Sequence, residues 1–186
     1  PYRAVKWPEN VHIFRGTKIE CIELPEQNVR IYGAGFVSPS CERPILKDFT
    51  AIKDGMINLM VLHGDTSAVT LNYNPVYITD IEKSGLEYLA LGHVHSYSGI
   101  QYAGETAWAY CGCIEGRGFD ELGDKGVIIG NVGTGKVDLR FERICLRRCE
   151  EINIGYDDLL NGKVVFPEEA KEDIYRIVLT GEREGD

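Results

Sequence analysis

Three of the four histidines directly follow apolar runs that are typical of strands. His63 follows the run 57–62, and His93 and His95 follow the run 86–91 with one valine between them. Such runs predict strands buried on both faces, and in α/β sheets ligands bind beyond the carboxyl ends of the strands. Residues i and i+2 of an extended chain point the same way. Because imidazole is a common metal ligand, we predict that His63, His93 and His95 bind metal.

The alternative is that these are loop histidines whose hydrogen bonds are satisfied. That interpretation suits one histidine better than three in the same context, in a chain that has only four. Gly64 and Gly92, beside the predicted ligands, would let the backbone turn sharply. His12 lies inside a strand-like segment and is assigned a structural role. Neutral imidazoles suit manganese, zinc and iron, so the histidines do not identify the metal.

The elements that would position these residues are short strands joined by turns. Apolar alternation or continuous apolar runs predict strands over residues 11–14, 18–24, 29–36, 57–62, 86–91, 105–113, 126–131, 136–144 and 173–180. Short helices are expected within residues 41–55, over 79–85 and over 157–163. Buried strands in this setting favour a layered α/β fold.

The cysteines are expected to be reduced thiols that pack as small hydrophobic residues. They are Cys21, Cys41, Cys111, Cys113, Cys145 and Cys149. The last four could in principle form a zinc site. Their spacing is poor for a zinc ribbon, so we favour the structural role.

Composition and charge narrow the class of protein. With 44% hydrophobic and 26% charged residues the chain resembles ordinary globular proteins. It has no apolar run long enough for a membrane span and no signal-peptide core at its start, so we expect a cytoplasmic protein without a membrane partner. The net charge of −9 is uneven, because residues 150–186 hold eleven acidic and four basic residues. That segment disfavours polyanions, so metal ions or local basic residues would have to attract a nucleic acid.

Three segments resemble the last motifs of calcineurin-like metallophosphoesterases. They are residues 60–64 (MVLHG), 89–95 (LALGHVH) and 110–121 (YCGCIEGRGFDE). The third is similar to the SbcD-type branch of DNA-repair exonucleases, where a Y-P-G-S-like turn leads to an R-x-F-x-E run. The order and spacing of the segments make the match specific. The resemblance covers about residues 9–144.

The resemblance implies a fold and a division into domains. The expected fold class is α/β, with residues 1–149 forming half of a four-layer α/β/β/α metallophosphoesterase sandwich. Residues 150–186 would begin a small α+β capping domain.

The resemblance also implies a metal site. The family uses two divalent ions, usually Mn²⁺, with Zn²⁺ or Fe²⁺ as alternatives. By position, His63 and His93 would bind one ion and His95 the other. Arg117 would contact phosphate, since guanidinium suits bidentate phosphate binding. The alternative for Arg117 is an ion pair with Asp120 or Glu121.

The chain departs from the family at its upstream motifs. D-x-H, G-D-x-x-D and G-N-H-[DE], which include the transition-state histidine, have no match in the sequence. The chain also starts without methionine, so we expect a fragment of a longer protein that is inactive by itself and that associates through exposed apolar surface.

The expected function is two-metal phosphodiester hydrolysis by a DNA-repair exonuclease or endonuclease, with DNA as substrate and an SMC-like ATPase as a partner. Two alternatives stay open. One is a small-molecule phosphodiesterase or phosphatase of the same superfamily, and the other is a non-catalytic scaffold that binds an SMC-like ATPase.

Overall fold

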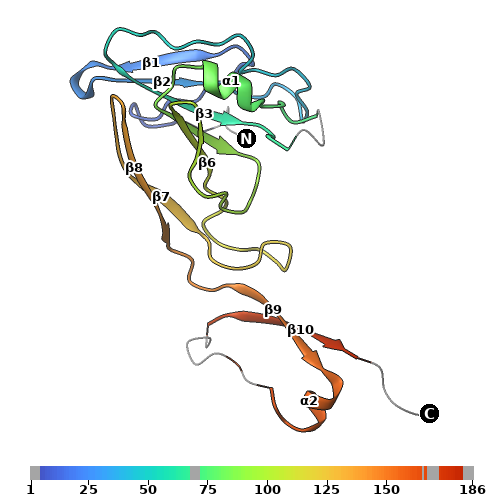
Figure 1. Cartoon of the computed structure of the whole chain (residues 1–186). Coiled ribbons are helices and arrows are strands. Elements are labelled where there is room, and N and C mark those ends of the chain that lie inside the picture. The colour runs from blue at the N-terminus through green and yellow to red at the C-terminus, as the bar shows by residue number, and fades with distance from the viewer. Residues whose placement is uncertain (1–4, 68–71, 165, 167–171, 182–186) are drawn as a thin grey trace. The chain divides into compact units, whose positions relative to one another are not determined.

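The computed structural model describes residues 5–67, 72–164, 166 and 172–181. Its main element is a six-stranded mixed sheet (Figure 1). The strand order across this sheet is β1-β2-β3-β4-β6-β5. The central strands β2, β3 and β4 run parallel, whereas β1 pairs with β2, and β5 with β6, in antiparallel fashion. The bounds are β1 Glu20–Leu24, β2 Val29–Gly33, β3 Ile57–His63, β4 Tyr88–Gly92, β5 Gln101–Ala103 and β6 Thr106–Tyr110.

The core of this sheet follows from the period-two pattern of its central strands. Met60 and Leu62 of β3 are buried on one face, and Leu89 and Leu91 of β4 are buried beside them. Val61, on the other face of β3, is 53% exposed. The buried face of the central strands therefore forms the core, and β3 ends beyond that core at His63.

The remaining strands form two two-stranded sheets. Strands β7 and β8 pair with each other, and β9 pairs in parallel with β10. The guanidinium of Arg148 donates to Asp173 Oδ2 at 2.6 Å, which ties the residue before β9 to the residue before β10. The bounds are η2 Pro25–Gln27, α1 Ile78–Lys83, β7 Gly126–Gly133, β8 Lys136–Arg143, β9 Cys149–Gly155, α2 Tyr156–Leu160 and β10 Ile174–Thr180.

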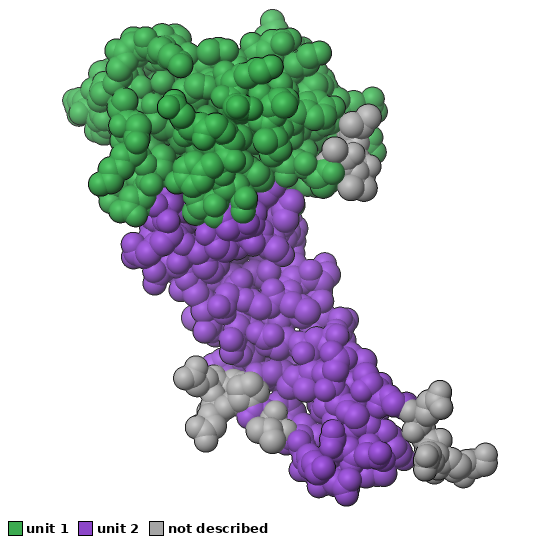
Figure 2. Space-filling view, viewed as in Figure 1, with its two compact units in different colours: residues 1–93, 100–109, 131–138 green, residues 94–99, 110–130, 139–186 purple. Residues whose placement is uncertain are grey.

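The chain divides into two compact units, which Figure 2 shows in green and purple. Unit 1 comprises residues 1–93, 100–109 and 131–138, and unit 2 comprises residues 94–99, 110–130 and 139–186. The predicted boundary between residues 1–149 and 150–186 stays a prediction. Within the described ranges, no helix has the length and the apolar character needed to cross a membrane.

The expected fold class is wrong. Strands make up 38% of the structure and helices only 8%, so it is mostly β and does not form half of an α/β/β/α sandwich followed by an α+β capping domain. The physical reason lies in the connections. The link from β2 to β3 has no helix, and the link from β3 to β4 contains only the six residues of α1 among its described part. Helices this short cannot cover a sheet as a layer.

Most of the predicted elements have counterparts, and two are wrong. The helices expected over 79–85 and 157–163 are present as α1 and α2, and the strands expected from residue 18 onward correspond to β1, β2, β3, β4, β6, β7, β8 and β10. Residues 11–14 form no strand, and residues 41–55 contain no helix. Strands β5 and β9 were not predicted.

Gly64 has a packing role that a side chain would break. A Cβ at this position would lie 2.6 Å from the Asn74 carbonyl oxygen and 2.7 Å from Val76 Cγ2. We expect Gly64→Ala to lower the free energy of unfolding by about 1–3 kcal/mol, the usual cost of overpacking. Gly16→Ala is the matched control, because a Cβ there meets nothing closer than 3.9 Å. Urea denaturation of both variants measures the difference, and equal stability of the two would contradict this packing.

Candidate functional site

His63 and His93 lie side by side at the carboxyl ends of two neighbouring parallel strands. His63 is the last residue of β3 and stands opposite Gly92, the last residue of β4. His93 follows immediately, and the two imidazole centroids are 5.1 Å apart with an interplanar angle of 75°. A Cβ on Gly92 would lie 3.4 Å from His63 Nδ1, an ordinary contact distance, so the His63 ring packs beside Gly92. The sheet register therefore produces the histidine pair.

The backbone of His93 adopts a conformation that is uncommon for a residue with a side chain. Its φ is 121°, and the chain bends there instead of continuing as a strand. Such backbone conformations cost about 1–3 kcal/mol and cluster at functional sites. The bend also means that residues 93–95 are not an extended chain, so the geometric reason for expecting His93 and His95 to point the same way does not hold.

Aromatic rings flank both members of the pair. The Phe36 ring meets His63 edge-on with centroids 5.4 Å apart, and the Tyr73 ring lies 4.9 Å from His93 at 32°. Rings packed at these distances restrict the rotation of both imidazoles. The histidine pair is therefore held on both sides within unit 1.

A buried asparagine ties the end of β3 to two other segments. Asn74 has no exposed surface; its side-chain amide donates to the His63 carbonyl at 2.8 Å, and its Oδ1 accepts from the Ile45 N–H at 2.6 Å. Asp65 is also buried, and its Oδ1 accepts from the Ser67 N–H at 2.7 Å. The backbone that carries His63 is thus fixed by hydrogen bonds from buried polar side chains, which are costly to leave unpaired.

His95 belongs to unit 2, where it contacts a buried carboxylate. His95 Nδ1 lies 2.5 Å from Glu121 Oε1, and Arg117 Nη2 lies 3.1 Å from the same oxygen. The Arg117 N–H donates to the other oxygen, Oε2, at 2.9 Å. These contacts lower the pKa of Glu121 to about 2, and the hydrogen bonds from Arg117 contribute more to this shift than the contact with His95 does. Glu121 is therefore ionised at neutral pH.

Arg117 forms an ion pair with Glu121, which confirms the alternative to phosphate contact given for it above. Its side chain is 73% exposed, and the pairing raises the pKa of its guanidinium. The role of Arg117 in phosphate binding stays a prediction. Sequence reasoning placed Glu121 only as a partner of Arg117 and missed its contact with His95, since 26 residues separate the two and no periodicity relates them.

The histidine pair has the spacing that a shared ion requires. Two imidazoles on one tetrahedral ion have centroids about 5 Å apart, given metal–nitrogen distances of about 2.1 Å. The observed 5.1 Å fits that value. Across the described parts of the chain, however, no three or more His, Cys, Asp or Glu side chains gather into a group that could hold a metal ion. The pair thus fits two ligands of a site, and convergence with His95 stays a prediction.

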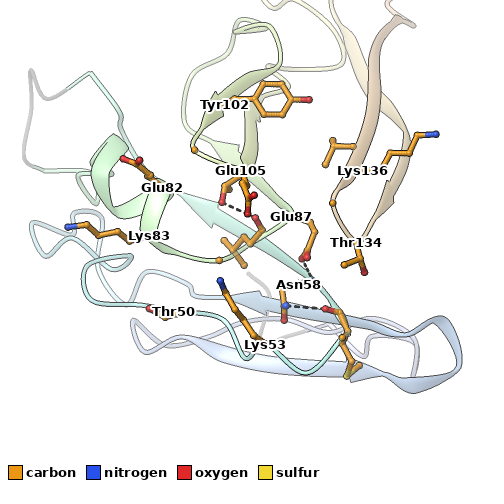
Figure 3. A pocket seen from close by; sticks show the side chains of 18 residues that line it. Thr50, Lys53, Asn58, Glu82, Lys83, Glu87, Tyr102, Glu105, Thr134 and Lys136 are labelled. Atoms are coloured by element: carbon orange, nitrogen blue, oxygen red, sulfur yellow. Dashed lines mark hydrogen bonds between the residues drawn. The ribbon is translucent and has the colours of Figure 1, made fainter.

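A large cavity lies at the other end of the central strands (Figure 3). It has a volume of about 1140 Å³ and extends around Asn58, at the start of β3, and Glu87, just before β4. The Asn58 N–H donates to Glu87 at 2.6 Å, and the Asn58 side chain donates to two backbone carbonyls. The charged side chains in its wall balance in sign: Lys53, Lys83, Lys136, Glu82, Glu87 and Glu105. Nothing here selects a ligand of one charge, so we place the candidate site at the histidines.

Comparison with known proteins bears on the superfamily and the reaction class of the chain. No protein-family model matches the chain. The chain is similar to the uncharacterized metallophosphoesterase YhaO of Bacillus subtilis (strain 168), with 31% identity over 147 residues that cover 76% of this chain and 36% of YhaO. The chain therefore spans little more than a third of that relative. The similarity supports the metallophosphoesterase superfamily and, at that level, phosphoester hydrolysis with divalent metal ions.

Removing either histidine of the pair should weaken metal binding. We expect His63→Ala and His93→Ala each to lower the affinity for Zn²⁺ by about tenfold or more, since losing even a residue behind a ligand costs about 10–100-fold. Isothermal titration of the chain with Zn²⁺ measures this. His12→Ala is the matched control, because His12 is an exposed histidine outside the predicted ligand set. Unchanged affinity in both pair variants would contradict the assignment.

Proposed function

We propose that the protein is a metal-dependent phosphodiester hydrolase of the SbcD-type branch that cleaves DNA. The observation that carries the proposal is the His63–His93 pair at the carboxyl ends of neighbouring parallel strands. The two ring centroids are 5.1 Å apart, and the backbone at His93 is strained. The similarity to a metallophosphoesterase supports the reaction class. Because the chain spans 36% of that relative, the activity proposed is that of the whole protein.

The proposed site holds two divalent ions, with Mn²⁺ as the proposed metal. His63 and His93 would hold one ion and His95 the other. Such ions, when bound, polarise phosphoryl oxygens and lower the pKa of a bound water. The chain's own contribution is to orient the imidazoles: the β3–β4 register and the flanking rings fix the pair, and Glu121 contacts His95.

The charge distribution favours substrate binding outside residues 150–186. Residues 150–186 are strongly acidic, which disfavours contact of that segment with DNA. Arg117 is proposed to contact phosphate. Only its Nη2 is engaged with Glu121, and a guanidinium has five N–H donors, so donors are left for a phosphate.

An SMC-like ATPase is the proposed partner, and the cytoplasm is the proposed location.

Activity assays with the whole protein test this proposal. With Mn²⁺ present, we expect cleavage of end-labelled duplex DNA, and a loss of at least about 100-fold in rate for His93→Ala, because the metal supplies several kcal/mol of transition-state stabilisation. His12→Ala should keep the wild-type rate. Nuclease activity that survives His93→Ala would overturn the proposal.

The same assays separate the alternative functions. Hydrolysis of bis-p-nitrophenyl phosphate without cleavage of DNA would favour a small-molecule phosphodiesterase. Hydrolysis of neither substrate, together with binding of an SMC-like ATPase in a pull-down, would favour a non-catalytic scaffold. Chelation with EDTA should abolish any activity of the proposed site, and re-addition of Mn²⁺ should restore it.

A further inference from the structure

We infer that Glu121 is a positioning residue whose carboxylate holds the His95 ring with its proton on Nδ1, so that Nε2 is the nitrogen presented to a divalent metal ion. The inference rests on the proposed function, because that function makes His95 a ligand. Neither the family resemblance nor the sequence pattern gave Glu121 this role.

The Glu121 side chain is buried and the His95 side chain is accessible, as expected for a positioning residue and the ligand that it positions. The Glu121 side chain is 5% exposed, whereas the His95 side chain is 52% exposed. The 2.5 Å contact between Nδ1 and Oε1 therefore joins an accessible ring to a buried carboxylate. Metal-binding histidines usually donate their second ring N–H to such a carboxylate, which fixes the orientation of the ring.

The hydrogen bonds of Arg117 decide which ring nitrogen carries the proton. Arg117 donates to Glu121 through both its side chain and its backbone N–H, so the Glu121 carboxylate is the acceptor in this cluster. His95 Nδ1 must therefore be the donor. Arg117 Nη2 also lies 3.3 Å from Nδ1, but two donors cannot bond each other, so its hydrogen bond goes to Glu121. Nε2 is left as the nitrogen with a lone pair in the neutral ring.

The backbone around both residues is fixed by contacts inside unit 2. Lys125 is buried, and its ammonium donates to the His95 carbonyl at 3.3 Å. Gly112 has a φ of 83°, and a Cβ on it would lie 2.9 Å from the same carbonyl oxygen. The Glu121 N–H donates to the Gly118 carbonyl at 3.0 Å. Glu121 and His95 are thus attached to a fixed backbone. The His95 ring can still rotate about its side-chain bonds, and the contact with Glu121 restrains this rotation.

The ring tautomer can be read directly by ¹⁵N NMR of the whole protein with labelled histidine and with metal removed. We expect the neutral His95 ring to carry its proton on Nδ1, although histidine in water favours Nε2. In Glu121→Ala the ring should return to the Nε2–H form, and in Glu121→Gln it should keep Nδ1–H, because an amide oxygen still accepts. A wild-type His95 ring protonated on Nε2 would overturn the inference without reference to any variant.

Metal affinity provides the second readout. We expect Glu121→Ala to weaken Zn²⁺ binding by about 10–100-fold, with a smaller loss for Glu121→Gln. Glu115→Ala is the control, since Glu115 accepts the N–H groups of Leu146 and Arg147 in the same unit and so has a structural role of its own. An equal loss in Glu115→Ala and Glu121→Ala would assign the effect to folding and would overturn the inference.

A His95→Ala variant separates failure of the inference from failure of the proposed function. If His95→Ala weakens Zn²⁺ binding and Glu121→Ala does not, the inference is wrong and His95 is still a ligand. If neither variant changes the affinity, His95 is not a ligand, and the proposed function loses that residue together with the inference.

Discussion

The parallel pairing of β3 with β4 is the constraint on which the candidate site depends. In this register His63 stands opposite Gly92, which brings His93 beside His63 at the end of the sheet. A slip by one residue would turn Met60 and Leu62 from the buried face to the exposed one, so burial of these side chains fixes the register. The core of unit 1 thus determines the position of both histidines.

The two parts of the proposed site are held by different physical means. His63 and His93 owe their positions to sheet register, to the buried Asn74 and to flanking aromatic rings. His95 owes its orientation to an ionised carboxylate and a buried lysine. Backbone pairing, a buried hydrogen-bonding side chain and ring packing thus fix the first part, and charged side chains fix the second.

Local patterns predicted the central strands, whereas contacts distant in sequence decided what the patterns missed. Continuous apolar runs correctly predicted β3 and β4, which end at His63 and Gly92. The helix expected within residues 41–55 is absent. There the Ile45 N–H bonds to Asn74, which lies 29 residues away. The strand expected over 11–14 is also absent, and there Phe14 packs its ring against Gly33.

The fold class failed for a related reason. The resemblance implied helical layers, but no long helical periodicity exists in the connections to form them, and α1 buries only Ile81. The role of Glu121 was equally hidden, since its partner His95 is 26 residues distant and only the folded backbone brings them together. Sequence patterns could thus locate the histidines but not the residues that hold them.

Crystals of the protein soaked in Mn²⁺ and measured for anomalous scattering would test the central claim most directly. The account predicts a metal peak about 2.1 Å from one ring nitrogen of His63 and one of His93. A peak only at the cysteines or at the cavity near Asn58, with no density between the two imidazoles, would contradict it.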